Sequence, residues 1–268
     1  MEKRANDLEG RAWTRHSISV WSDIGKSRKE LALRHPAMFP VALAGRLIEM
    51  FTRKGMRVLD PFSGIGSTVV AARDLGRIGI GVELNADYVA LANERLARAE
   101  PELESGHGDG TGAMIEGDAR ALSSFVEPSS VDLVVTSPPY WDILTAKRTA
   151  DFKAIRNYGG DTRDLGNITD YDEFLAELSG VVRQLYAAVR VGGYCCFVVM
   201  DIRKKNRFYP FHSDVARLLQ EAGFEYDDLI VWDRGGEYNN LRPLGYPAVF
   251  RVNKVHEFIV IVRKPVSP

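Results

Sequence analysis

The chain has 268 residues, of which 45% are hydrophobic and 26% charged, and its formal net charge is −1 at pH 7. One α/β domain of this length can bury a sizeable core, and the near-neutral charge excludes a polycation, so a nucleic-acid surface would have to be a local patch. No apolar run is long enough to span a membrane and the N-terminus has no apolar signal region, so we expect a protein of the cytoplasm without a membrane partner.

The polar N-terminal segment, residues 1–34, includes Trp13 and Trp21, and we expect it to form a flap or extension. Residues 35–268 are then expected to form a single domain. Apolar residues recur at helical spacing from about residue 39 to residue 51, which predicts the first helix of that domain.

A tight glycine turn follows the first predicted strand, residues 56–60. The turn spans residues 61–68, where Gly64 and Gly66 let the backbone approach a ligand without a Cβ clash. Asp60 ends the strand, and its carboxylate can accept the ammonium group of a ligand. The same carboxylate argues against a phosphate ligand, although a helix N-terminus otherwise suits phosphate.

The next predicted strand, residues 78–83, ends in a second acid. Glu83 lies 23 residues after Asp60, near the spacing at which an acid binds ribose hydroxyls in a nucleotide-binding βαβ unit. The third glycine of a dinucleotide site is replaced by Val69. The pattern is closer to the F-x-G-x-G form of enzymes that use S-adenosylmethionine (SAM).

Strands and helices continue to alternate along the rest of the chain. A glycine-rich loop is predicted at 100–112, and a long irregular segment at 141–169 has the length of a functional or mobile loop. Further helices are predicted at 85–99, 171–189 and 211–222, and further strands at 113–118, 131–136, 193–200, 226–233 and 256–263. This alternation predicts an α/β fold with a doubly wound, mainly parallel sheet of seven strands. Ligands of such sheets bind where the strand order reverses, and we expect strands 56–60 and 131–136 to flank that point.

Two adjacent cysteines, Cys195 and Cys196, lie inside a predicted apolar strand. Neighbouring residues of a strand point to opposite faces, so the two thiols are not expected to pair with each other. We expect reduced core thiols, which is consistent with the cytoplasm. No His/Cys cluster has metal-ligand spacing, so no metal is expected.

The sequence T-S-P-P-Y at residues 136–140 closes the strand 131–136. Prolines lack an N–H and fix φ, so this turn is rigid and its carbonyls are free to accept hydrogen bonds from a ligand. Tyr140 offers a flat face for stacking. These features suit a site that holds a planar base by its exocyclic amino group. The alternative is a strand that ends in a Pro-Pro turn, with Tyr140 in the core.

Together these motifs resemble the S-P-P-Y type of the amino-group DNA methyltransferases, the family that makes N4-methylcytosine or N6-methyladenine. The resemblance implies a Rossmann-like class I SAM-dependent methyltransferase fold, SAM as the methyl donor and double-stranded DNA as the substrate. It implies a SAM site made of His35, Pro36, Phe39, Pro40, Asp60, Pro61, Phe62, Ser63, Gly64, Gly66, Ser67, Thr68, Glu83, Leu84, Asp118 and Ala119. For Asp118 the alternative is a cap of the turn that follows it.

The resemblance also implies that Ser137, Pro138, Pro139 and Tyr140 form the catalytic motif. An exocyclic amino nitrogen is a poor nucleophile, because its lone pair is delocalised into the ring. Acceptors at the Ser137 side chain and the Pro138 carbonyl would localise that lone pair for direct attack on the SAM methyl group. Catalysis would then consist of orientation and charge placement on a base that has left the duplex stack.

With serine before Pro-Pro, the resemblance implies N4 of cytosine as the target, as in DNA modification or restriction–modification, where a cognate endonuclease is a partner. N6 of adenine is the first alternative, and an RNA amino-group methyltransferase is the second. A small-molecule methyltransferase and a non-catalytic binding protein are the remaining classes.

Basic residues predict where DNA phosphates would bind, although a charge run is more often a solvated surface. The candidates are Lys147, Arg148, Arg203, Lys204, Lys205, Arg207 and Arg242. The segments at about 141–169 and 234–255 are the predicted recognition loops.

Overall fold

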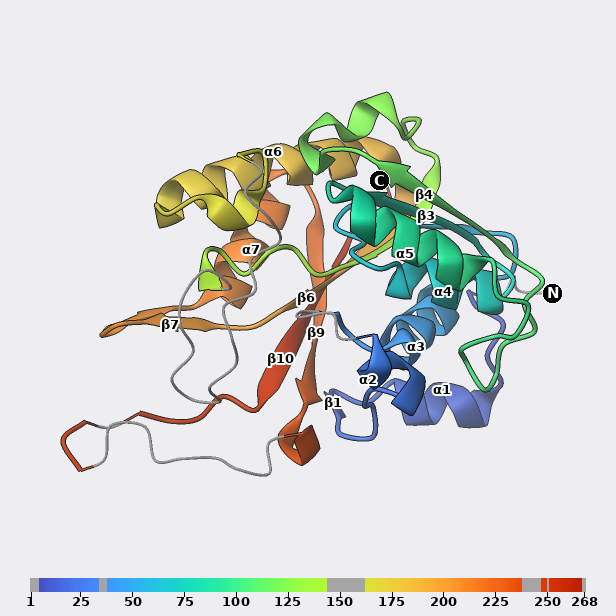
Figure 1. Cartoon of the computed structure of the whole chain (residues 1–268), viewed down its shortest axis with the longest axis horizontal. Coiled ribbons are helices and arrows are strands. Elements are labelled where there is room, and N and C mark those ends of the chain that lie inside the picture. The colour runs from blue at the N-terminus through green and yellow to red at the C-terminus, as the bar shows by residue number, and fades with distance from the viewer. Residues whose placement is uncertain (1–4, 34–37, 144–161, 238–246, 250, 267–268) are drawn as a thin grey trace.

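The computed structural model describes residues 5–33, 38–143, 162–237, 247–249 and 251–266 (Figure 1). The predictions at His35, Pro36, Lys147, Arg148 and Arg242 lie outside the described residues.

An eight-stranded sheet with the order β1-β9-β10-β6-β5-β2-β3-β4 forms the centre of the fold. Its strands are β1 (Val20–Trp21), β2 (Arg57–Asp60), β3 (Ile78–Glu83), β4 (Thr111–Glu116), β5 (Val131–Thr136), β6 (Val189–Val199), β9 (Glu225–Asp233) and β10 (His256–Arg263). Only β10 runs antiparallel to its neighbours among these strands. The predicted doubly wound, mainly parallel sheet is therefore confirmed. The eighth strand is β1, whose two residues are too few to show an alternating pattern.

Helices cover both faces of the sheet. They are α1 (Gly10–His16), α2 (Arg28–Ala32), α3 (Val41–Phe51), α4 (Ser67–Asp74), α5 (Ala86–Leu96), α6 (Tyr171–Ala188) and α7 (Phe211–Glu221), with 3-10 turns at Ala119–Ser124, Leu165–Asn167 and Gly235–Glu237. One buried apolar cluster joins α6 and α7 to the sheet, and a second joins α3 and α4 to its other face. Figure 1 shows the same separation, with α3, α4 and α5 together and α6 and α7 apart from them. Within the described residues, no helix is long and apolar enough to cross a membrane.

The strand order reverses between β2 and β5, which are neighbours in the sheet although β3 and β4 lie between them in sequence. They are the first and fourth predicted strands, as expected at the reversal point. Ligands of doubly wound sheets bind at the carboxyl ends of strands at this point. The topology therefore brings the glycine turn after β2 next to the T-S-P-P-Y segment after β5.

The glycine turn enters α4 through Gly66, which has a φ of 80°. A glycine adopts this left-handed conformation without strain, and a Cβ here would also lie 3.0 Å from that of Ala92. The helix α4 therefore begins directly after Gly66, at Ser67. The next helix, α5, is capped by Asn85, whose side chain accepts hydrogen bonds from the backbone of Asp87 and Tyr88.

A hairpin stands apart from the main sheet. Its strands are β7 (Ile202–Lys204) and β8 (Arg207–Tyr209), which form a separate two-stranded sheet. Figure 1 shows β7 extending away from the central strands. The hairpin carries the predicted basic run 203–207.

The N-terminal segment packs against the edge of the sheet. Trp21 is fully buried, and the indole N–H of Trp232 donates to the carbonyl of Ile24. The buried carboxylate of Glu30 accepts hydrogen bonds from the backbone N–H groups of Ser27 and Val41. Because Val41 opens α3, this carboxylate ties the N-terminal segment to the start of that helix.

Candidate active site

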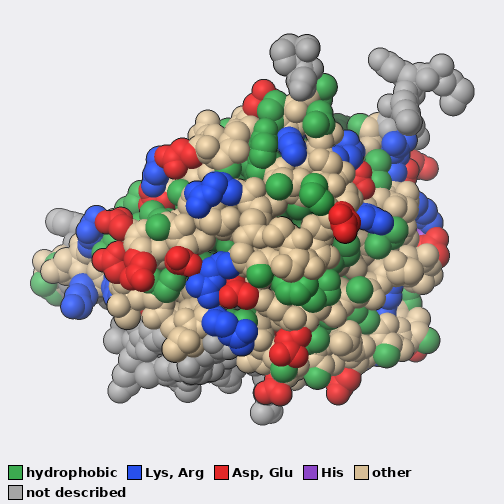
Figure 2. Space-filling model, turned by 90° about the horizontal axis from the view of Figure 1, so that it is seen from above, with side chains coloured by type: hydrophobic (Ala, Val, Ile, Leu, Met, Phe, Trp, Pro, Cys, Tyr) green, Lys and Arg blue, Asp and Glu red, His purple; other side chains and the backbone are tan. Residues whose placement is uncertain are grey.

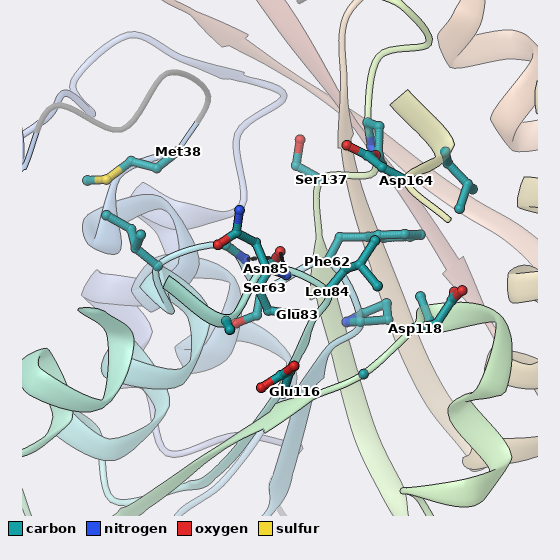
Figure 3. Close-up of a pocket in the computed structure, with 18 of the residues that line it drawn as sticks. Met38, Phe62, Ser63, Glu83, Leu84, Asn85, Glu116, Asp118, Ser137 and Asp164 are labelled. Carbon is teal, nitrogen blue, oxygen red and sulfur yellow. Dashed lines mark hydrogen bonds between the residues drawn. The ribbon is translucent and has the colours of Figure 1, made fainter. Parts of the chain in front are cut away.

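One pocket lies at the carboxyl ends of β2, β3, β4 and β5, and both sequence motifs open onto it (Figure 3). The glycine turn lines it with Phe62, Ser63 and Gly64, among others, and the double-proline turn lines it with Ser137 and Pro139. In the view of Figure 3, Ser137 lies between Met38 and Asp164. A ligand bound on the glycine turn would therefore share this pocket with Ser137.

Asp60 lies beneath this pocket and does not line it. The side chain is 1% exposed, and it accepts hydrogen bonds from Thr68 Oγ1 at 2.8 Å, Thr136 Oγ1 at 2.6 Å and the Phe62 N–H at 3.1 Å. Burial raises the pKa of Asp60 to about 6, against the lowering effect of the two threonine hydroxyls. The structure thus shows this carboxylate joining the two turns, whereas direct contact with an ammonium group remains a prediction.

Several other predicted SAM contacts also lie behind the wall of the pocket. Pro40, Gly66 and Thr68 do not line it, whereas Phe39, Pro61 and Ser67 do. Pro40 caps α3, and Gly66 and Thr68 shape the entry into α4. These three residues therefore shape the backbone that carries the lining side chains, and they do not line the pocket themselves.

Glu83 points from the end of β3 toward the glycine turn. Its carboxylate accepts hydrogen bonds from the N–H groups of Gly64 at 2.8 Å and Asn85 at 2.9 Å. Burial raises the pKa of Glu83, while these hydrogen bonds act in the opposite direction. Glu83 and Leu84 both line the pocket, so the predicted ribose-binding acid lies where a nucleoside could reach it.

Asp118 has its carboxylate turned toward Arg120. The side chain caps the 3-10 turn that begins at Ala119, and it pairs with the Arg120 guanidinium at 2.7 Å. Burial alone would raise the pKa of Asp118, but the hydrogen bonds and charge of Arg120 outweigh burial and lower it. The structure therefore shows Asp118 as the cap of the turn that follows it, which is the alternative that the sequence left open. Asp118 and Ala119 still line the pocket.

Further lining residues were not among the predicted SAM contacts. Arg163, Asp164 and Leu165 enter from the end of the long segment after β5, and Met38, Asn85 and Glu116 also line the pocket. Glu116 ends β4 as Glu83 ends β3, but the strand was predicted at 113–118, so the sequence placed Asp118 rather than Glu116 at its tip. The acids of the lining are Glu83, Asp87, Glu116, Asp118 and Asp164, against one arginine among the described residues. Such a pocket favours a cationic ligand over a phosphate.

The double-proline turn holds a chain of hydroxyl groups. Ser137 Oγ donates to Tyr140 Oη at 3.1 Å, and Tyr140 Oη donates to Glu257 Oε2 at 2.9 Å. The Tyr140 ring lies edge-on to Phe211, with ring centroids 6.1 Å apart. Burial, followed by the charge of Glu257, raises the pKa of the Tyr140 phenol well above its usual value, so this phenol stays protonated.

The basic hairpin packs against the residues that follow the double-proline turn. Lys204 forms an ion pair with Asp142 and lies 3.7 Å from the centre of the Trp141 ring. Lys204 is therefore held by the protein in this structure, and its contact with a phosphate stays a prediction. Arg203, Lys205 and Arg207 are exposed.

Charge is mixed on the molecular face seen from above. Figure 2 shows acidic and basic side chains interspersed there rather than gathered into a field of one sign. This agrees with the formal net charge of −1. The exposed cations of the hairpin are Arg203, Lys205 and Arg207.

The comparisons with known proteins agree with this geometry. A family model described as "DNA methylase" matches residues 2–94 and 131–268. The type II methyltransferase M.SmaI of Serratia marcescens is 45% identical over 64 residues, which are 24% of this chain and 22% of that protein. A putative methylase, YubD of Escherichia coli (strain K12), is 44% identical over 72 residues, which are 27% of this chain and 32% of that protein. The matched stretches thus span less than two thirds of these relatives.

Similarity to a solved structure supports the fold. A SAM-dependent methyltransferase from Methanosarcina mazei superimposes with a TM-score of 0.52 at 16% identity, covering 82% of this chain and 98% of that one. At this identity the match shows a shared fold.

Proposed function

The chain belongs to the DNA methylase family, and we propose that it transfers the methyl group of SAM to the exocyclic amino group of a base in double-stranded DNA. The observation that carries this proposal is the single pocket shared by the glycine turn and the double-proline turn. Residues 35–268 would form the catalytic domain. The segments 141–169 and 234–255 are proposed to read the DNA site.

The pocket residues fit SAM by their charge and their apolar surface. SAM supplies an electrophilic methyl group on a sulfonium, so the acidic lining complements its positive charges. Glu83 is proposed to hold the ribose hydroxyls, and Phe62 and Leu84 offer apolar surface for the adenine ring. The backbone at Gly64 lies directly beside Glu83, so the glycine turn and the ribose site are built as one unit.

Ser137 and the Pro138 carbonyl are proposed to accept the two N–H groups of the target amine. These contacts would localise the nitrogen lone pair and aim it at the methyl group, so that catalysis rests on orientation and charge placement. A covalent cysteine intermediate is not needed. Cys195 and Cys196 are fully buried on opposite faces of the sheet, and burial raises the pKa of both thiols.

The exposed cations of the β7–β8 hairpin are proposed to bind DNA phosphates. The hairpin packs on Trp141 and Asp142, which follow the catalytic turn directly. A phosphate bound at Arg203 or Arg207 would therefore place the duplex close to the pocket. A partner endonuclease is a proposal that rests only on the type II names of relatives such as M.SmaI.

Cytosine N4 is the target we propose, because serine precedes the two prolines at position 137. Adenine N6 is the alternative, since the two proposed acceptors, Ser137 and the Pro138 carbonyl, would serve the amino group of either base.

Tritiated SAM, unmethylated bacterial genomic DNA and total RNA test this function. We expect acid-stable tritium in the DNA, and digestion to nucleosides should give N4-methyldeoxycytidine. Label in N6-methyldeoxyadenosine would select the alternative, and label confined to RNA would contradict the DNA substrate.

A further inference from the structure

The hydroxyl chain behind the pocket has one direction. Ser137 lines the pocket and donates to Tyr140, and Tyr140 donates to Glu257. The Tyr140 oxygen also lies 3.2 Å from the carbonyl of Val198, but a carboxylate at 2.9 Å is the stronger acceptor. Each hydroxyl proton thus already points away from the pocket and toward a carboxylate that is 5% exposed.

Methylation of an amino group leaves one proton too many. The nitrogen forms its bond to the methyl carbon while the carbon–sulfur bond breaks, and that electron pair stays on sulfur. The product nitrogen is then positively charged and still carries both of its original protons. One of them must leave to give the neutral methylamino base.

We propose that Ser137, Tyr140 and Glu257 form a proton relay that carries this proton out of the pocket as the nitrogen–carbon bond forms. Ser137 Oγ takes the amino proton and passes its own to Tyr140 Oη, which passes its own to Glu257 Oε2. Both hydroxyls end with one proton, Glu257 ends as a carboxylic acid, and its proton goes to solvent after the product leaves. The inference rests on the proposed function of the same pocket.

Charged groups from three segments surround the end of this relay. Arg234 follows β9 and contacts Glu257, while Glu237, in the next 3-10 turn, holds the other side of the Arg234 guanidinium at 2.6 Å. Lys26 and Glu30 come from the N-terminal segment, and the Lys26 charge interacts with Arg234, Glu237, Glu30 and Glu257. The acceptor is therefore held in place by Arg234, and Tyr140 is the link that joins it to Ser137.

A double-mutant cycle tests the relay. The probe is a DNA duplex that contains the site found by methylation sequencing, and the measurement is the single-turnover rate of methyl transfer. We expect Tyr140→Phe and Glu257→Gln each to lower this rate by about 10²-fold, the lower range for proton transfer by a positioned side chain. The double variant should be no slower than Tyr140→Phe alone, because both changes cut one path. Losses that multiply would overturn the relay.

Deuterium oxide separates proton transfer from a purely structural role. The wild-type rate should fall in deuterium oxide, and both single variants should lose this solvent isotope effect. A wild-type rate that is equal in the two solvents would overturn the relay. Tyr140→Phe keeps the ring that packs on Phe211, so it keeps the test valid even where Glu257→Gln lowers stability.

Glu237→Gln is the matched control, because it removes a carboxylate from Arg234 without touching Tyr140. Glu237→Gln should keep the solvent isotope effect. Loss of the isotope effect in this variant would contradict the role assigned to Glu257. A wild-type protein that labels no nucleic acid overturns the proposed function together with the relay. If the wild type methylates DNA efficiently but the losses of Tyr140→Phe and Glu257→Gln multiply in the double variant, the relay is overturned and the proposed function stands.

Discussion

Thr136 Oγ1 donates a hydrogen bond of 2.6 Å to the carboxylate of Asp60, 76 residues away in sequence. This contact joins the end of β5 to the end of β2 beneath the pocket. Thr68 donates to the other carboxylate oxygen from the first turn of α4. One buried acid thus connects the turn proposed to hold SAM with the turn proposed to hold the base.

Removing one hydroxyl should loosen this connection. Thr136→Val keeps the shape of the side chain but leaves a buried carboxylate oxygen with one partner fewer, which should cost about 1–3 kcal/mol of unfolding free energy. Urea denaturation measures the loss. Thr111→Val, at the exposed start of β4, is the control and should change the unfolding free energy by less than about 0.5 kcal/mol. Equal effects of the two substitutions would contradict the role of Thr136.

The raised pKa of Asp60 predicts a dependence of stability on pH. Its pKa rises from 3.8 to about 6 on folding, so the folded state binds the proton more tightly than the unfolded state. The contribution to stability is therefore full below pH 3.8 and is lost as the pH rises through about 6. The shift corresponds to about 3 kcal/mol. The unfolding free energy of wild type minus that of Asp60→Asn should fall between about pH 4 and pH 7, and a flat difference would show that the carboxyl pKa is not raised.

Glu83 should control SAM affinity. Glu83→Ala removes the proposed ribose acceptor and the partner of the Gly64 and Asn85 N–H groups, so the Kd for SAM should rise by at least about 10-fold, the equivalent of one charged hydrogen bond. Isothermal titration calorimetry measures this Kd. Glu94→Gln, on the exposed side of α5, should leave the Kd unchanged. An unaltered Kd in Glu83→Ala would remove Glu83 from the SAM site.

The hairpin cations should set the salt dependence of DNA binding. Reversing Arg203, Lys205 and Arg207 to Glu should reduce the slope of log K against log salt by up to about 0.9 for each phosphate that these cations neutralise in the wild type. Fluorescence anisotropy with duplex DNA at several salt concentrations measures the slope. Reversal of Arg11, Arg15 and Arg28, exposed on α1 and α2, changes the net charge by the same amount and is the control. If both sets change the slope alike, the hairpin has no special role.

Much of the fold could be predicted from the sequence, because local patterns determine it. The apolar runs at β3, β5 and β10 and the periodic helices α3 and α6 lie where their patterns indicate, within two residues. The boundary between α6 and β6 was less visible. The strand begins at Val189 rather than 193, because pairing of Val189 with Val131 on β5 extends it across Gly192 and Gly193.

The site was predictable as a set of motifs but not as a set of contacts. The family match confirms the resemblance that the motifs gave. Sequence could not show that Asp60 is covered by two threonines, that Asp118 faces Arg120 or that Lys204 pairs with Asp142, because each partner is chosen by tertiary packing. Glu257 lies 117 residues from Tyr140, and no spacing rule joins them.

Ser137→Ala tests the shared pocket most directly, with two measurements on one protein: the Kd for SAM and the single-turnover rate of methyl transfer to DNA. Because Ser137 is proposed to contact the amine rather than SAM, the Kd should stay within about twofold of wild type while the rate falls by about 10²-fold or more. An unchanged rate, or losses of equal size in affinity and rate, would contradict a pocket in which the methyl donor and the target base lie side by side.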